Sequence, residues 1–83
     1  MYKIVFTKEA ARAIQRSPQD VARLIREKLA EIATDPFAPH PNATKLQGHP
    51  GYRLRVGDWR AIYDVQQTEL VVIVLKIARR GEV

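Results

Sequence analysis

The sequence predicts a small α+β fold with the element order β-α-α-β-β-β, in which a small, mainly antiparallel sheet carries an N-terminal helical hairpin on one face. Three observations predict it. Helical spacing of apolar residues is confined to the stretch between Thr7 and Asp35, alternation with a period of two begins at Tyr52, and turn-forming residues separate the segments. At 83 residues the chain is expected to form a single domain, residues 1–83, with a thin core.

The first strand is expected at residues 2–6, where β-forming apolar side chains alternate with a lysine and a valine. Thr7 is then expected to cap a short helix that ends near Arg16. Glu9 falls in its first turn, where the helix dipole favours negative charge.

The second helix has the clearer start signal. Ser17-Pro18-Gln19-Asp20 offers a capping serine, a proline for the first helical position and an acid three residues after the cap. Apolar residues then follow at helical spacing until Asp35-Pro36, where the helix is expected to end because the residue before proline avoids helical dihedrals. With almost no loop between them, the two helices should form a hairpin.

Residues 35–51 hold four of the five prolines and are expected to form an irregular loop. The strand that follows, from Tyr52 to Val56, should place Arg53 and Arg55 on the face opposite to its apolar side chains.

Two further strands complete the expected sheet. After the Gly57-Asp58 turn, residues 59–65 alternate as the next strand, and Leu70 to Ile77 is nearly all apolar. An apolar run of this kind predicts a central strand that is buried on both faces. The first strand should pair beside it, which leaves the helices on one face of the sheet and the other face open.

The composition narrows the classes of partner. The net charge of +5 and the isoelectric point near 10.0 favour polyanions or a strongly acidic protein. The chain has no cysteine, which excludes a disulfide framework and a cysteine-based zinc site. Its N-terminus lacks a signal-peptide pattern, and the longest apolar run, Leu70 to Leu75, is too short to span a membrane. We therefore expect a soluble cytoplasmic protein with no membrane partner.

Two groups of cations stand out in the second half of the chain. Between His40 and Tyr63 the cations Lys45, Arg53, Arg55 and Arg60 are opposed only by Asp58, and Arg79 and Arg80 follow the last strand and precede Glu82. Guanidinium groups hold phosphate in bidentate geometry and keep their charge, so several around one phosphodiester could stabilise a pentavalent transition state. The alternative is a solvated polar face on which the arginines simply alternate outward, and the pattern alone favours it slightly.

Other candidate residues are weaker. His40 and His49 lie in the proline-rich loop, where an exposed histidine without a role is commoner than a general acid or base, and their spacing fits no metal motif. Trp59 and Tyr63 could stack on nucleobases, but alternate strand positions favour the core. The sequence contains no glycine-rich phosphate loop and no serine-nucleophile motif.

Several segments together resemble the RelE/ParE toxin superfamily, and the RelE-like branch is favoured. They are YKIVFTKEA at 2–10, KLQG at 45–48, GYRLRVGDWRAIY at 51–63 and KIARRGEV at 76–83. The resemblance covers nearly the whole chain and implies the RelE-like fold, a small sheet with a helical hairpin at its N-terminal side.

The resemblance also implies an activity. RelE toxins of type II toxin–antitoxin systems are hydrolase-class mRNA interferases, endoribonucleases that inhibit translation. They promote attack of a ribose 2′-hydroxyl on the neighbouring phosphate in the ribosomal A site, without a metal or other cofactor. The implied partners are a small acidic cognate antitoxin encoded nearby, mRNA on the ribosome, and operator DNA only through the antitoxin complex. Two alternatives stay open: a ParE-like inhibitor of DNA gyrase, and an inactive relative that serves as antitoxin partner and co-repressor.

By the same resemblance, Arg53, Arg60 and Arg80 are the expected catalytic residues. Arg60 would bind the scissile phosphate and Arg53 would stabilise its charge, since arginine hardly deprotonates. Arg80, with Arg79 as the weaker candidate, would bind the phosphate or assist the leaving 5′-oxygen. The residues expected to bind RNA are Lys45, Arg55, Lys76 and Arg79.

The sequence departs from the family pattern at two places. Some RelE toxins carry a further basic residue two positions before the equivalent of Arg53, where this chain has Gly51. Many also place a tyrosine or a histidine–tyrosine pair directly after the Glu-Val that is here Glu82-Val83. Either the catalytic set is reduced or the natural protein continues beyond Val83.

Overall fold

The computed structural model describes residues 1–81, so Glu82 and Val83 lie outside the described residues. The elements in chain order are β1 (Lys3–Phe6), α1 (Lys8–Arg16), α2 (Gln19–Thr34), β2 (Ala43–Lys45), β3 (Tyr52–Val56), β4 (Trp59–Gln66) and β5 (Val71–Arg79). The predicted order β-α-α-β-β-β is thus confirmed, with one strand, β2, added inside the expected loop.

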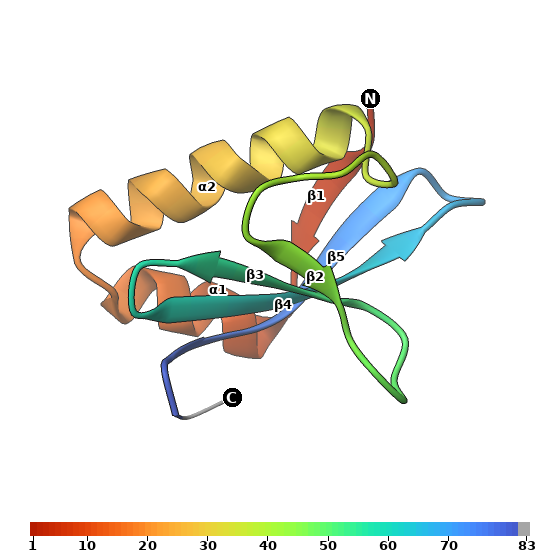
Figure 1. Cartoon of the computed structure of the whole chain (residues 1–83). Helices are drawn as coiled ribbons and strands as arrows, with labels where there is room; N and C mark the ends of the chain where they lie inside the picture. Colours follow the sequence, from red (N-terminus) through yellow and green to blue (C-terminus); the bar gives the residue numbers. More distant parts are fainter. Residues whose placement is uncertain (82–83) are drawn as a thin grey trace.

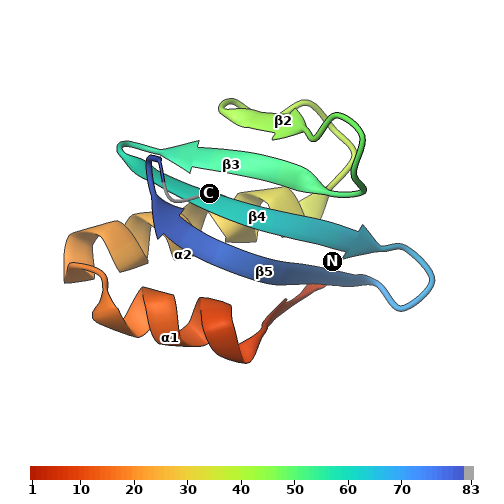
Figure 2. The same ribbon diagram turned by 90° about the horizontal axis from the view of Figure 1, so that it is seen from below.

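The strands form one mixed sheet in the order β1-β5-β4-β3-β2. β1 runs parallel to β5, while β2, β3, β4 and β5 pair antiparallel in sequence. The predicted pairing of the first strand beside the last is therefore confirmed. Figures 1 and 2 show both helices on one side of the sheet, with α1 running along β5. The opposite face of β2 to β5 carries no helix in Figure 2.

The core lies between the helices and the covered face of the sheet. Its largest fully buried side chains are Tyr63, Ile25, Leu29, Ile32, Leu54, Val72 and Val74. The Tyr63 ring stacks on that of Tyr52 at a centroid distance of 5.2 Å, and Trp59 is only partly buried at the edge of the core. The core assignment is thus confirmed for Tyr63 and holds only in part for Trp59. Neither helix is long and apolar enough to cross a membrane, as far as the described residues go.

The junction between the helices corrects one prediction. Ser17 does not cap α2: its hydroxyl donates to the carbonyl of Ile14, at 2.7 Å, and its backbone N–H bonds Ala13, so it closes α1. The N-cap of α2 is Pro18, which supplies no side-chain hydrogen bond. With only two residues between the helices, the serine that would start one helix ends the other.

A second correction concerns the loop. Residues 35–51 contain β2, whose three residues pair with β3 through Ala43 and Leu54, Thr44 and Arg53, and Lys45 and Tyr52. A three-residue edge strand has no periodicity of its own to detect, because its pairing depends on the neighbouring strand.

A third correction concerns β5, which is buried on one face only. Val72 and Val74 are fully buried against the helices, whereas Val71 and Ile73 on the other face are half-exposed and Leu75 is 39% exposed. The strand is apolar on both sides, yet no helix covers its second side. The sheet register shifts beside Leu75, because Tyr63 pairs with Val74 and Ile62 with Lys76.

Candidate nucleic-acid interface

The uncovered face of the sheet carries two transverse rows of side chains, most of which are polar. In one row Thr44 pairs with Arg53, and Arg53 pairs with Ile62. In the other, Arg55 pairs with Arg60, and Arg60 with Ala78. Leu54 between the two arginines of β3 is 1% exposed, so Arg53 and Arg55 point to the uncovered face as predicted.

Asn42 extends the second row. It directly precedes β2, and its carbonyl accepts a hydrogen bond from the backbone N–H of Arg55 at 2.8 Å. The second row therefore runs from Asn42 through Arg55 to Arg60.

These rows line two adjoining hollows. One, of about 410 Å³, is lined by Asn42, Thr44, Arg53, Arg55 and Arg60. The other, of about 370 Å³, is lined by Asn42, Arg55, Gly57, Asp58, Arg60 and Arg80. Because Asn42, Arg55 and Arg60 belong to both, the two hollows form one surface, which we call the arginine hollow. Its volume suits a small polar ligand.

The C-terminal end of β5 brings Arg80 to this surface. The Arg80 backbone N–H donates to the carbonyl of Asp58, at 2.6 Å, which ties the end of the last strand to the β3–β4 turn. The structure therefore brings together Arg53, Arg60 and Arg80, the three arginines that were expected to act on one phosphate.

The arginines of the hollow form no ion pair within residues 1–81, and Asp58 is the one carboxylate among the residues that line it. Arg55 and Arg60 stand directly opposite each other on neighbouring strands, a like-charge pairing that destabilises a sheet. One Arg60 nitrogen donates to the carbonyls of Gly57 and Trp59, both at 3.0 Å, so it is held by neutral groups. Within residues 1–81 no carboxylate forms an ion pair with the four arginines of the hollow. A cluster of this kind attracts anions.

The remaining expected RNA-binding residues do not line the hollow. Lys45, at the end of β2, pairs with Tyr52 and alternates away from Thr44, so it faces away from the hollow. Lys76 pairs with Ile62 and so continues the row of Thr44 and Arg53. Together with Arg79 it also lines a groove of about 720 Å³ between α1 and β5, which we call the helix groove. The expectation that they bind RNA stays a prediction.

The two histidines lie outside the arginine hollow, whereas two polar residues that were not expected there line it. His40 Nε2 lies 2.7 Å from the carbonyl of Asp35, and His49 is exposed; neither lines the arginine hollow. Sequence reasoning missed Asn42 and Thr44, because both fell in the expected loop. The one available signal was an asparagine between a proline and a short β-forming segment.

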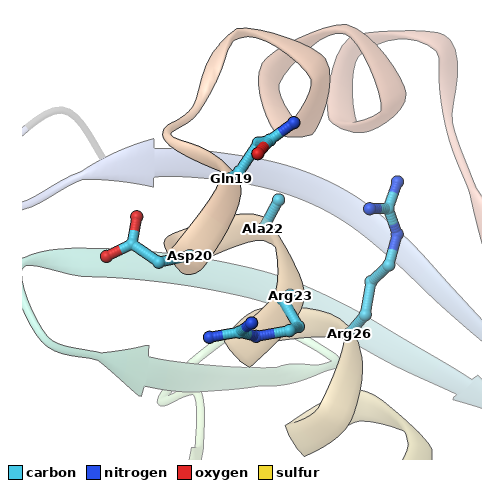
Figure 3. Close-up of a pocket in the computed structure, with 5 residues that line it drawn as sticks. All are labelled: Gln19, Asp20, Ala22, Arg23 and Arg26. Carbon is cyan, nitrogen blue, oxygen red and sulfur yellow. The ribbon is translucent and has the colours of Figure 1, made fainter.

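One more depression lies on the outer side of the molecule and is formed by α2 alone. Its lining residues are Gln19, Asp20, Ala22, Arg23 and Arg26. Figure 3 shows the guanidinium groups of Arg23 and Arg26 pointing in different directions, so they do not converge on one anion. Nor do three or more histidine or acidic side chains gather as metal ligands anywhere in residues 1–81.

Comparison with known proteins adds a family assignment. Residues 4–83 match the sequence family described as ParE toxin of type II toxin–antitoxin system, parDE. No curated protein sequence matches the chain significantly.

Solved structures of toxins share the fold. The isolated RelE toxin of E. coli superposes with a TM-score of 0.86 at 22% identity, covering 100% of this chain and 88% of that one. RelE in the E. coli RelBE toxin–antitoxin complex gives 0.83 at 24% identity, with 100% of both chains covered. The archaeal RelE–RelB complex of Pyrococcus horikoshii OT3 gives 0.81 at 29% identity and covers 99% of this chain and 98% of its counterpart.

Proposed function

The chain belongs to the ParE toxin family of type II toxin–antitoxin systems, and from this premise we propose that it is a metal-independent endoribonuclease that cuts mRNA on the ribosome. The observation that carries the proposal is the arginine hollow, in which Arg53 of β3, Arg60 of β4 and Arg80 after the end of β5 line one surface and form no ion pair among the described residues. Cationic charge that is left without an ion pair in this way destabilises the free protein and is compensated when a polyanion binds.

The chemistry would be transfer of the phosphate within the RNA. The ribose 2′-oxygen forms a bond to the neighbouring phosphorus, and the bond from phosphorus to the 5′-oxygen breaks, which leaves a 2′,3′-cyclic phosphate. The hydroxyl proton passes to water, and the departing 5′-oxygen takes up a proton. Because arginine holds its proton at neutral pH, the hollow would supply positive charge to the transition state rather than a base.

Each arginine then has a distinct place in the proposal. Arg60 lies at the centre of the hollow, and one of its guanidinium nitrogens is oriented by two backbone carbonyls, so it suits the scissile phosphate. Arg53, one row away, would stabilise the developing charge. Arg80, which the β3–β4 turn holds at the other end, would interact with the leaving oxygen.

The test is Arg60→Ala, with Arg23→Ala as the matched control because Arg23 is an exposed arginine of α2 outside the hollow. Primer extension on translated mRNA should show cleavage for the wild type and the control. Because the Arg60→Ala variant lacks the transition-state contact, its cleavage rate should be about 100-fold lower than that of the wild type, or lower still. Unchanged cleavage by Arg60→Ala would remove this arginine from the mechanism.

A second function, inhibition of DNA gyrase, is favoured by the family match to ParE toxins. The two functions separate cleanly with purified protein. Inhibited supercoiling with intact translated mRNA would favour the gyrase branch. Tight binding to the antitoxin without either activity would indicate an inactive relative that serves as partner and co-repressor.

We also propose that the helix groove receives the cognate antitoxin. Its lining includes the apolar side chains of Trp59 and Ile77. Five cations also line it, against one acid, Glu9: Lys8, Arg12 and Arg16 on α1, and Lys76 and Arg79 on β5. An acidic amphipathic segment matches both features. The similar RelE chains that were solved in complexes with RelB make an antitoxin the expected partner. Operator DNA would be bound only through that complex.

A further inference from the structure

Asn42 is fixed by its backbone at the mouth of the arginine hollow. It adopts φ 66°, a left-handed conformation that asparagine tolerates better than most residues. Its carbonyl is bonded by Arg55, and the next residue, Ala43, donates its N–H to His40 at 3.2 Å. The backbone on both sides of the side chain is therefore held in place.

The Asn42 carboxamide has no hydrogen-bond partner within residues 1–81, nor does the hydroxyl of Thr44. Both side chains line the hollow, and both are exposed. Their polar atoms are thus available to a ligand.

The hydrogen-bonding chemistry of these two side chains differs from that of the arginines. Guanidinium groups only donate, which suits phosphate oxygens, whereas an amide and a hydroxyl both donate and accept. Among the residues that line the arginine hollow, only Asn42 and Thr44 have side chains that do both. A nucleobase edge presents donors next to acceptors, so these two residues suit a base rather than a phosphate.

The spacing fits one nucleotide. Asn42 is two strands away from Arg60 along its row, which corresponds to about 10 Å at the normal separation of strands. A phosphate on Arg60 would leave the base of the same or the adjoining nucleotide within reach of β2.

We propose that Asn42, with Thr44 beside it, forms a nucleobase-binding subsite that selects the base next to the phosphate held by the arginines. The inference rests on the proposed function in taking single-stranded RNA as the ligand. Adenine is the expected base, because it offers a donor next to an acceptor on both of its hydrogen-bonding edges, and asparagine pairs with it in bidentate fashion. Unpaired bases in single-stranded RNA expose these edges.

The test uses four short RNAs that carry a 2′-deoxy nucleotide at the attacked linkage, so that they bind without being cut, and that differ only in the adjoining base. Fluorescence anisotropy with purified toxin at low salt measures their affinities. The wild type should bind the adenine RNA at least about fivefold more tightly than the others, the effect of one bidentate pair.

Two variants of Asn42 test whether the base preference comes from its side chain. Asn42→Gly accepts the left-handed backbone and removes the amide, so it should bind all four RNAs about equally. Asn42→Asp keeps the shape of the side chain, but its carboxylate only accepts hydrogen bonds. Its preference should therefore move to guanine, whose unpaired Watson–Crick edge presents two adjacent donors, N1–H and N2–H₂. Gln47→Ala, which removes an exposed carboxamide outside the hollow, should keep the adenine preference.

The outcomes distinguish this subsite from the proposed cleavage. Equal binding of all four RNAs by the wild type, no binding, or an unchanged preference in Asn42→Gly overturns the subsite even where translated mRNA is cut. A base preference that Asn42→Gly abolishes supports the subsite, and if mRNA then stays intact, the cleavage proposal alone fails.

Discussion

Gly51 occupies the position at which some related toxins have a further basic residue, and its backbone explains why this chain does not. Its φ is 107°, and a Cβ atom there would stand 2.9 Å from the carbonyl oxygen of Tyr63. Any side chain at this position would therefore have to push against the backbone of β4. The additional basic residue cannot be restored here without moving the strands apart.

Gly51→Ala should accordingly lower the free energy of unfolding by at least about 2 kcal/mol, through backbone strain and the close contact. Gly48→Ala is the control, because Gly48 also has a positive φ, 74°, but its added Cβ would meet nothing within 4 Å. Its cost should be about 1 kcal/mol. Urea unfolding measures both, and equal costs would contradict the proposed contact with Tyr63.

Tyr63 should make stability depend on alkaline pH. Burial, together with the neighbouring Tyr52, raises the pKa of Tyr63 from 10.0 to about 12. The neutral form is thus favoured in the folded state, and its contribution is complete below the unfolded pKa near 10 and is lost as pH rises towards 12. Between about pH 9 and about pH 11, the wild type should lose about 1 kcal/mol more than Tyr63→Phe. Parallel pH profiles of the two proteins would exclude this linkage.

Thr7 joins two elements and is the clearest test at the scale of the element. Its hydroxyl accepts from the N–H of Ala10 at 3.1 Å, which caps α1, and donates to the carbonyl of Leu75 at 3.0 Å, where the register of β5 shifts. Thr7→Ala removes both bonds and should cost about 2 kcal/mol of unfolding free energy.

Two comparisons make this prediction specific. Thr7→Ser keeps both hydrogen bonds and should stay near the wild type. Thr34→Ala loses only the exposed bond to the Glu31 carbonyl and should change stability by less than about 0.5 kcal/mol. If Thr7→Ala behaves like Thr34→Ala in denaturant unfolding, the link between α1 and β5 is not important for stability.

The elements that the sequence predicts well are those with a signal in their own residues. Capping at Thr7, the proline after Asp35 and the alternation from Tyr52 are local, and they correspond to the observed start of α1, end of α2 and start of β3. The formation of β2 depends on pairing with β3, and the exposure of one side of β5 depends on the absence of a covering helix. Neither can be predicted from a local sequence pattern.

In the candidate site, too, some residues could be placed from a local pattern and others only from the tertiary structure. Arg53 and Arg55 could be placed on one face because they lie two residues apart on a single strand. Their convergence with Arg80 depends on the register of β4 and β5 and on a backbone bond to Asp58. Asn42 enters the hollow only because it extends β2, so its place could not be predicted while β2 was missed.

At the scale of the whole molecule, the net charge of +5 is distributed over surfaces that face different ways. The arginine hollow lies on the uncovered face of the sheet, while the helix groove lies between α1 and β5. Figure 2 shows α1 on the side of β5 away from β3 and β2. An antitoxin in the helix groove would therefore reach Arg79 and, through the adjoining end of β5, the neighbourhood of Arg80. One partner could in this way block access to the proposed RNA site on the uncovered face from the edge of the sheet.

This arrangement predicts that antitoxin affinity depends on where the charge lies and not only on its sum. Arg12→Glu with Arg16→Glu reverses two charges on the α1 side of the helix groove, whereas Arg23→Glu with Arg26→Glu makes the same change in net charge on α2. Close charge pairs across an interface are each worth more than about 1 kcal/mol, so the α1 variant should bind the co-expressed antitoxin at least about 10-fold more weakly. The α2 variant should stay within about threefold, since Arg23 and Arg26 do not line the helix groove and salt weakens the long-range effect of exposed charges. Titration of the antitoxin at two salt concentrations measures the affinities of both variants.

Because screening weakens the α1 contacts, the difference in affinity between the two variants should shrink at the higher salt concentration. Equal losses of affinity in the two variants would show that the antitoxin responds to net charge alone.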